Sequence, residues 1–145
     1  MSTVEDFLSK TDEEAIVEAI RSAESLTSGE IRVHIEKNTS LVALERAKEV
    51  FYFLKMDQTQ LRNGVLLYIA VESKTFAIYG DQGINNAVSA DFWESTRDTI
   101  LQEFKQGNFK QGLIQGILKA GIQLQKHFPW IETDKNELPD TISKG

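Results

Sequence analysis

Seven consecutive apolar residues at positions 65–71 constrain the fold of this chain more than any other stretch. The turn signal Asn63-Gly64 precedes them, so the run is predicted to be a strand that leaves a turn. Because the run is apolar on both faces, the strand needs cover on both faces, which places it at the centre of a sheet. The run is far shorter than the roughly 20 residues that a membrane-spanning helix needs, so we expect no membrane insertion.

Two further strands are predicted beside the central one. Residues 30–37 alternate between apolar and polar, which indicates a half-covered strand with its apolar residues toward the core. The uncovered face of that strand carries polar side chains: Arg32, His34 and Glu36. A two-residue turn at Ser73-Lys74 leads into the third strand at 75–79, so the last two strands are predicted to form an antiparallel hairpin.

Apolar residues at helical spacing predict four helices. The first begins at a capping box formed by Thr11 and Glu14, and Ser28-Gly29 stops it. The other three are predicted at 44–55, 88–106 and 108–128. On the last of these, Gly112 and Gly116 have the GxxxG spacing, which predicts close packing against a neighbouring helix.

The order of these elements indicates the fold class α/β, as a three-layer α/β/α sandwich with a small mixed β-sheet flanked by helices. At 145 residues we expect a single domain over 1–130, followed by a polar, flexible C-terminal tail over 131–145. The first residues contain neither the basic segment nor the apolar segment of a signal peptide, so we expect a cytoplasmic protein.

Charge and cysteine content exclude several classes of function. The net charge of −6 argues against binding to the phosphate backbone of nucleic acid, and it permits a cation site. The absence of cysteine excludes disulfides, thiolate catalysis and cysteine-based zinc or iron–sulfur centres. The sequence also lacks a glycine-rich phosphate-binding loop, a nucleophile-elbow serine and an HExxH motif.

The oxygen-rich stretch 80–91 is the best candidate for a functional site. It leaves the third strand and enters a helix, which is where open α/β sheets place their ligands. Asp81, Asp91 and the amides between them are hard oxygen ligands that suit Ca²⁺ or Mg²⁺. The alternative is a structural loop, in which Asp81 and Asn85 bond nearby backbone as an Asx-turn and helix N-cap.

Four short motifs, in a fixed order, resemble those of the TPM domain family. They are Ser28-Gly29-Glu30-Ile31, Arg62-Asn63-Gly64-Val65-Leu66, Gly80-Asp81-Gln82-Gly83-Ile84 with the later Asp91, and the glycine-containing stretch 104–112. The resemblance covers about 12–128. It implies an α/β/α sandwich and, in several members, a divalent-cation site of acidic residues near the edge of the sheet. The matching acidic positions are Asp81, Asp91 and Glu30.

Two functions are weighed on these grounds, with a purely structural partner-binding domain as a third. The first is a binding module that holds a divalent cation, Ca²⁺ before Mg²⁺, and has an interaction or regulatory role toward an unidentified protein partner. The second is a metal-dependent phosphatase acting on phosphomonoesters, because some plant members of the family are described as acid phosphatases. The metal would polarise the phosphoryl oxygen, and Arg62 and Arg97 are the side chains available to contact the phosphate.

Overall fold

The computed structural model describes residues 8–130 and 142–144. In chain order its elements are α2 (Lys10–Glu24), β1 (Glu30–Glu36), α3 (Ala43–Phe53), the 3-10 helix η1 (Met56–Gln58), β2 (Gly64–Ala70), β3 (Thr75–Gly80), α4 (Gln82–Ala87), α5 (Ala90–Lys105), α6 (Phe109–His127) and β4 (Ser143–Lys144). Across these two ranges, no helix is both long and apolar enough to cross a membrane.

The strands form one mixed sheet in the order β3-β2-β1-β4. β1 runs parallel to β2, and their register begins with Glu30 opposite Gly64. β3 runs antiparallel to β2 and places Gly80 opposite Val65. Every residue of β2 is buried, so the predicted central strand at 65–71 is confirmed, with its bounds one residue earlier.

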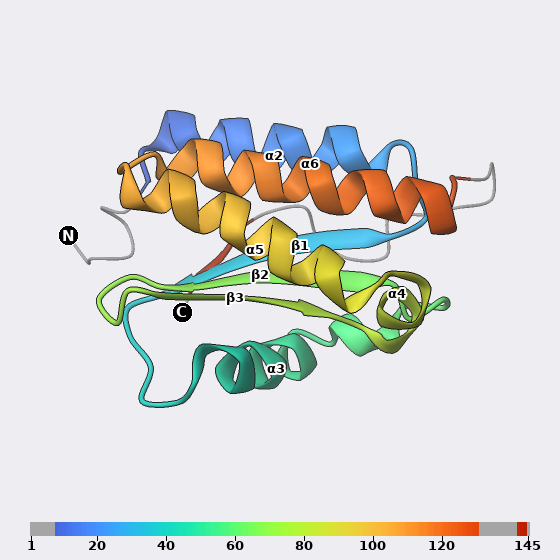
Figure 1. Ribbon diagram of the computed structural model, residues 1–145, viewed down its shortest axis with the longest axis horizontal. Helices are drawn as coiled ribbons and strands as arrows, with labels where there is room; N and C mark the ends of the chain where they lie inside the picture. The colour runs from blue at the N-terminus through green and yellow to red at the C-terminus, as the bar shows by residue number, and fades with distance from the viewer. Residues whose placement is uncertain (1–7, 131–141, 145) are drawn as a thin grey trace.

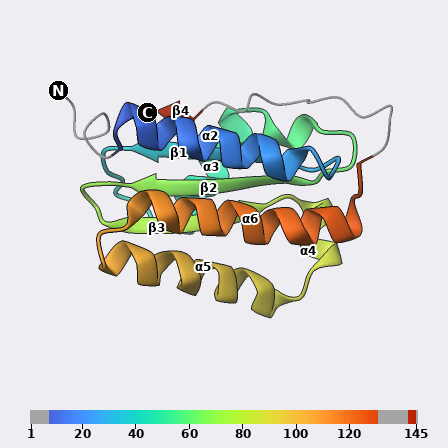
Figure 2. The ribbon, with the colours of Figure 1, turned by 90° about the horizontal axis from the view of Figure 1, so that it is seen from above.

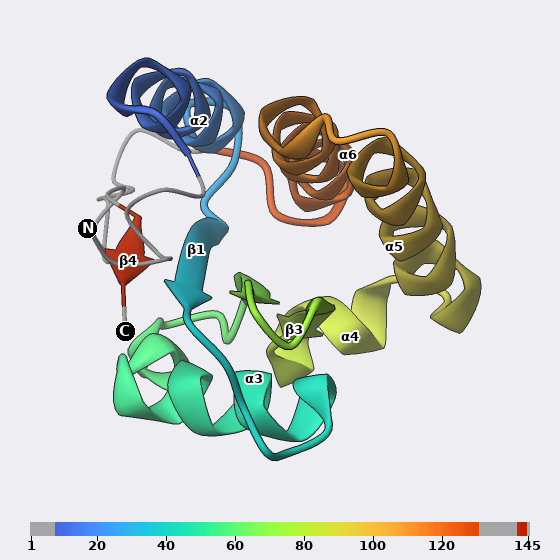
Figure 3. The same cartoon turned by 90° about the vertical axis from the view of Figure 1, so that its left-hand side faces the viewer.

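Helices cover both faces of the sheet. Figure 1 shows α2, α5 and α6 on one side and α3 on the other, and the end-on view of Figure 3 shows the same layers. Seen from above in Figure 2, α2, α6 and α5 lie side by side across one face. The larger core lies beneath these three helices, and a smaller core of Phe51, Met56 and Tyr68 lies beneath α3. The predicted three-layer α/β/α sandwich is confirmed.

Two glycines of α6 allow this helix to pack directly against α5. A Cβ atom at Gly116 would lie 2.3 Å from Cδ1 of Ile100, and one at Gly112 would lie 2.9 Å from Cε1 of Phe104. A side chain at either position would push into the neighbouring helix, because these interiors are already close-packed. The close helix packing predicted from the GxxxG spacing is therefore confirmed.

Three local features differ from the sequence prediction. α2 is capped by Ser9, whose hydroxyl accepts a hydrogen bond from the Asp12 N–H at 3.0 Å, and not by Thr11. Propensity alone cannot choose between these two hydroxyl residues. The turn between β2 and β3 spans residues 71–74 rather than two residues, and Lys74 has a φ of 55° within it. The stretch after Asp81 forms the short helix α4, which periodicity did not predict.

Two of the three residues on the polar face of β1 are buried, whereas alternation predicted that this face would be uncovered. His34 and Glu36 are each 6% exposed, because α3 and β4 cover them. The Glu36 carboxylate accepts hydrogen bonds from Arg46 Nε at 2.8 Å, from Arg46 Nη2 at 3.0 Å and from the Tyr68 hydroxyl. His34 bridges Glu36 and β4, with Nε2 3.3 Å from Glu36 Oε1 and Nδ1 2.9 Å from Ser143 Oγ.

Charge is balanced within this buried cluster. Burial alone would raise the pKa of the Glu36 carboxyl, but hydrogen bonds from Arg46, Tyr68 and His34 hold it at about 2. Burial lowers the pKa of His34, so its ring is neutral at neutral pH. A neutral ring can donate from Nε2 to Glu36 and accept at Nδ1 from the Ser143 hydroxyl. The cluster thus contains a fully ionised carboxylate whose partners are all donors.

Two residues of the segment predicted to be a flexible tail form β4. Ser143 pairs with His34 and Lys144 with Ile35, in parallel register. The Lys144 ammonium also lies 2.6 Å from Oε1 of Glu13 on α2. The rest of that segment, residues 131–141 and 145, lies outside the described residues.

Candidate functional site

Three chain segments meet at the end of the sheet where β1 and β2 begin and β3 ends. The sheet register places Glu30 beside Gly64, and it places Gly80 on the other side of β2, opposite Val65. The Asp81 N–H continues this pairing by donating to the Gly64 carbonyl at 2.9 Å. In Figure 1 this end of the sheet is the one that carries α4.

An ion pair between Arg62 and Asp81 joins the loop before β2 to the loop after β3. Nε and Nη2 of Arg62 donate to Oδ2 and Oδ1 of Asp81 at 2.9 and 3.0 Å. Asp81 is 1% exposed, whereas the Arg62 side chain is 43% exposed, so the guanidinium lies between the carboxylate and solvent. The hydrogen bonds to Asp81 raise the pKa of the Arg62 guanidinium. This two-pronged geometry fixes the relative position of the two loops.

Asp81 also caps α4, which is the structural role considered as the alternative to a metal site. Its Oδ1 accepts a hydrogen bond from the Gln82 N–H at 2.7 Å. Asn85, one turn further along α4, donates from its side-chain amide to the Gly80 carbonyl at 2.7 Å. Both side chains therefore bond nearby backbone, as the structural interpretation of this stretch predicted.

Gly83 lets α4 approach the loop before β2 closely. Its N–H donates to the Arg62 carbonyl at 2.8 Å. A Cβ atom at this position would lie 2.2 Å from the Leu61 carbonyl oxygen and 2.6 Å from that of Arg62. Because both obstacles are backbone atoms, only glycine fits here without moving the chain. The close approach holds Asp81 against Arg62.

A side-chain hydrogen bond joins the first turns of α5 to α4. The indole N–H of Trp93 donates to Oδ1 of Asn85 at 2.9 Å. Asp91 lies in the first turn of α5, and it is exposed. A carboxylate at this position is stabilised by the positive end of the helix dipole. Among the three predicted metal ligands, Asp91 is the one most open to an incoming ion.

The structure does not gather the three predicted metal ligands into one cluster. Asp81 follows β3 and Glu30 begins β1, so β2 separates them in the strand order, and Glu30 is only 2% exposed. Over residues 8–130 and 142–144, no three His, Asp or Glu side chains are arranged to hold a metal ion. A cation at this end of the sheet would therefore depend on one or two carboxylates, backbone carbonyls and water.

Arg62, the partner of Asp81, has a different contact in the structure from the one expected from the sequence. Arg62 was considered for contact with a phosphate, but in the structure its guanidinium is bound to Asp81. The two residues are 19 positions apart, and they become neighbours only through the pairing of β2 with β3. Charge balance was the available signal, since a carboxylate buried at a strand end needs a nearby cation.

Arg97, the second candidate for phosphate contact, lines a groove of about 430 Å³ along the edge strand β3. Val42 bounds this groove on the α3 side, and Trp93 and Glu94 bound it on the α5 side. The Arg97 side chain is 48% exposed, and its Nη2 lies 3.8 Å from Oδ1 of Asp98. A guanidinium in this position can meet a small anion from solvent.

This chain matches a known family model and is similar to proteins of known structure. A family model described as the TPM domain matches residues 2–122. The chain is also similar to the BA42 protein of the psychrophilic bacterium Bizionia argentinensis, whose NMR structure superimposes with a TM-score of 0.91. Identity to that protein is 61%, and the match covers 100% of both chains.

Two more distant NMR structures share the fold. The N-terminal domain of the cg2496 protein from Corynebacterium glutamicum is 14% identical, with a TM-score of 0.64, and the match covers 81% of this chain and 74% of that one. The N-terminal domain of a protein from P. gingivalis is 17% identical, with a TM-score of 0.67 and coverage of 87% and 83%. No curated protein sequence matches this chain.

Proposed function

This chain belongs to the TPM domain family, and from this premise we propose that it is a divalent-cation-binding module with an interaction or regulatory role. Ca²⁺ is the preferred ion, because it accepts six to eight oxygen ligands in a flexible arrangement, whereas Mg²⁺ demands near-ideal octahedral geometry. The proposed site is the segment 81–91. Asp91 and Asp81 are its carboxylate ligands, and Glu30 is a third acidic group at the same end of the sheet.

The observation that supports the proposal most is that the Asp91 carboxylate is exposed beside a segment whose side chains are held in place by hydrogen bonds. Asp91 is open to solvent, while Asp81 is held by Arg62 and Trp93 is held by Asn85. The two ends of the segment are therefore positioned before any ion arrives. Preorganisation of this kind lowers the ordering cost of binding. When bound, Ca²⁺ would supply positive charge and six to eight oxygen coordination positions.

Asp81 can contribute to such a site only in a restricted way. A carboxylate has about four lone-pair positions. Two of those on Asp81 accept from Arg62 and one accepts from the Gln82 N–H. An added cation has to share the last position or displace the guanidinium, and either choice lowers affinity. We therefore expect weak binding, with a Kd on the order of 10⁻⁴ M.

The interaction role is supported by apolar side chains exposed on and around α3. Phe53 is 83% exposed and Val42 is 68% exposed, and Leu44, Tyr52 and Leu61 are between 43% and 53% exposed. Exposed apolar surface of this kind is typical of protein-contact sites. A partner that binds there would contact α3, on the opposite side of the sheet from α2, α5 and α6.

Calcium is expected to stabilise the native chain. At about 10 mM, roughly 100 times the expected Kd, Ca²⁺ should add about 2.7 kcal/mol to the free energy of unfolding, or roughly 5–10 °C in Tm. Asp91→Asn should remove most of this shift. The matched control is Asp98→Asn, an exposed aspartate two turns further along the same helix, which should keep the shift. Thermal melts of the three proteins with and without Ca²⁺ measure this.

The role of Asp81 is tested by freeing it from its partner. If Asp81 is a ligand, Arg62→Gln should increase the Ca²⁺-induced shift, because the cation no longer competes with the guanidinium. Arg97→Gln removes the same charge from α5 and should not increase it. Equal Ca²⁺ shifts in wild type, Asp91→Asn and Arg62→Gln would show that the ion does not bind at this segment.

A metal-dependent phosphatase is the second candidate, and the groove beside β3 is the observation that favours it. Arg97, in the middle of α5, lines this groove, where a phosphate could be held against its guanidinium. Arg62 is less suited to this role, because its guanidinium is bound to Asp81. A bound cation would polarise the phosphoryl oxygen.

If this candidate is correct, the chain should hydrolyse p-nitrophenyl phosphate in the presence of Ca²⁺ or Mg²⁺. Asp91→Asn and Arg97→Gln should each lower kcat/KM by at least about tenfold, because each removes charge stabilisation from the reacting phosphate. Turnover that survives both substitutions would identify a contaminating enzyme. No turnover between about pH 4 and 8 would leave the binding module as the function.

A further inference from the structure

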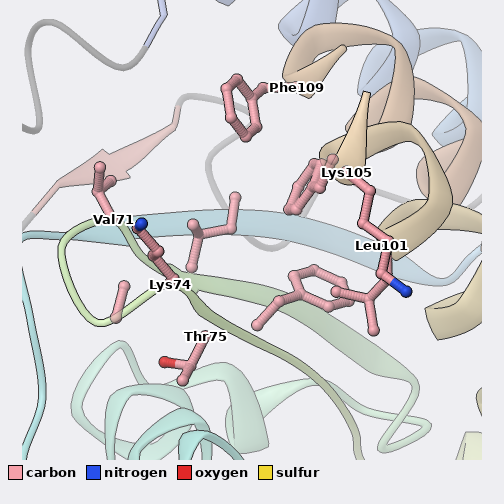
Figure 4. Close-up of a pocket in the computed structure, with 10 residues that line it drawn as sticks. Val71, Lys74, Thr75, Leu101, Lys105 and Phe109 are labelled. Carbon is pink, nitrogen blue, oxygen red and sulfur yellow. The ribbon is translucent and has the colours of Figure 1, made fainter. Parts of the chain in front are cut away.

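A cavity of about 680 Å³ lies at the opposite end of the sheet from Arg62 and Asp81. It forms where β2 ends and β3 begins, beneath the last turns of α5 and the first turn of α6 (Figure 4). Its volume is within the range of roughly 300–1,000 Å³ that is typical of small-molecule sites. This cavity and the proposed cation site are separate, because they lie at opposite ends of the same strands.

Most of the cavity wall is apolar. Phe104 lies between two other rings, with its centroid 5.7 Å from that of Phe76 and 5.3 Å from that of Phe109. These three aromatic side chains form a continuous wall. The remaining large apolar lining residues are Ile69, Val71 and Leu101. A surface of this composition stabilises an alkyl chain, because each methylene that leaves water contributes favourably to binding.

Two lysines give the opening of the cavity a positive charge. Lys74 comes from the β2–β3 turn and Lys105 from the end of α5, and both are exposed. In Figure 4 they lie on opposite sides of the lining residues. Neither ammonium forms an ion pair with any of the described residues, and none of the ten lining residues is acidic. The charge at the opening is therefore positive, although the net charge of the whole chain is −6.

We propose that this cavity binds a monomeric amphipathic anion, namely an unbranched alkyl chain that carries one carboxylate, as in a medium-chain fatty acid. The alkyl chain would pack against the wall formed by Phe76, Phe104 and Phe109. The carboxylate would remain at the opening, where the field of Lys74 and Lys105 attracts it. A small polar anion would leave the apolar wall unused, and a neutral hydrocarbon would gain nothing from the lysines.

The first experiment titrates the full isotope-labelled chain with octanoate, decanoate and dodecanoate, each below the concentration at which it aggregates. Saturable amide shifts are expected at 69–76 and 101–109. The Kd should fall by on the order of tenfold for every two methylenes added. Decanol, which has the same chain without the charge, should bind several-fold more weakly than decanoate.

Variants then separate the contribution of the charge from that of the wall. The double variant Lys74→Gln/Lys105→Gln should weaken decanoate by about tenfold, since each exposed ion pair contributes a factor of roughly two to five. It should leave decanol unchanged. Lys48→Gln, an exposed lysine on α3 across the sheet, is the matched control and should leave both unchanged. Leu101→Trp should weaken both ligands, because its indole fills part of the cavity.

Four results would overturn the proposal. The first is no saturable response to monomeric decanoate or dodecanoate. The second is shifts centred outside 69–76 and 101–109. The third is equal affinity for decanoate and decanol that the lysine substitutions do not change. The fourth is binding to anionic phospholipid vesicles without any response to the monomeric acids, which would show that the cavity contacts a membrane surface instead of a monomeric acid.

Discussion

Replacing Glu36 with alanine is expected to lower the free energy of unfolding by about 3 kcal/mol. The substitution leaves Arg46, the Tyr68 hydroxyl and His34 without the acceptor that they share in the native state. Buried donors that lose their acceptor keep their full desolvation cost. Glu49→Ala is the matched control, because Glu49 also accepts from Arg46, at 3.0 Å, but is 57% exposed. It should cost less than about 1 kcal/mol in urea unfolding.

The same carboxylate gives stability a defined dependence on pH. The pKa of Glu36 is about 2 in the folded state, against an ordinary value of 4.5. A group with a depressed folded-state pKa stabilises the protein fully above its unfolded value and loses that contribution as pH falls through the folded value. About 3 kcal/mol should therefore disappear between about pH 4.5 and 2. Glu36→Gln should be less stable at pH 7 and should lack this part of the pH slope. Identical slopes in the two proteins would contradict the assignment.

Replacing Gly83 with alanine is expected to cost about 3 kcal/mol, because the new methyl group would meet backbone and not a flexible side chain. The carbonyl oxygen of Leu61 would lie 2.2 Å from the added atom. Relief of this clash requires α4 to move away from Arg62, which breaks the 2.8 Å hydrogen bond from Gly83 and separates the Arg62–Asp81 pair.

Gln82→Ala, one residue earlier on α4 and exposed, is the control for Gly83→Ala and should change stability by less than about 0.5 kcal/mol. Urea unfolding of the two variants gives the comparison. Equal midpoints would mean that the loop before β2 can move with little loss of stability. That result would contradict the proposed rigidity of this end of the sheet.

The layers of this fold were predictable because they follow from local patterns. A run that is apolar on both faces identified β2 as the central strand. Glycine spacing predicted that the last helix packs closely against a neighbouring helix, and the structure shows that this neighbour is α5. Each of these signals lies within a few residues, and each concerns which side of an element is buried. The spacing of apolar residues along the sequence directly indicates which side of a helix or strand is buried.

The side-chain pairs were not predictable, because they join residues that the fold brings together from a distance. Alternation predicted that Glu36 would be uncovered, since a charged residue normally faces water, and only α3 supplies the arginine that permits its burial. In the same way Asp81 was predicted to be a metal ligand, while the structure supplies Arg62 as its counter-charge. The position of Asp81 directly after the third strand could therefore be predicted, but its ion pair with Arg62 could not.

The position of β4 has a consequence during synthesis of the chain. His34 on β1 pairs with Ser143, which is 109 residues later. At about 5–20 residues per second, the outer edge of β1 waits roughly 5–20 s for this partner. An unpaired strand edge invites pairing with another nascent chain, and inward-pointing charged side chains are one way in which proteins prevent it. The charged side chains of Arg32 and Glu36 would therefore keep β1 from pairing with a neighbouring chain on the same polysome until β4 has been synthesised.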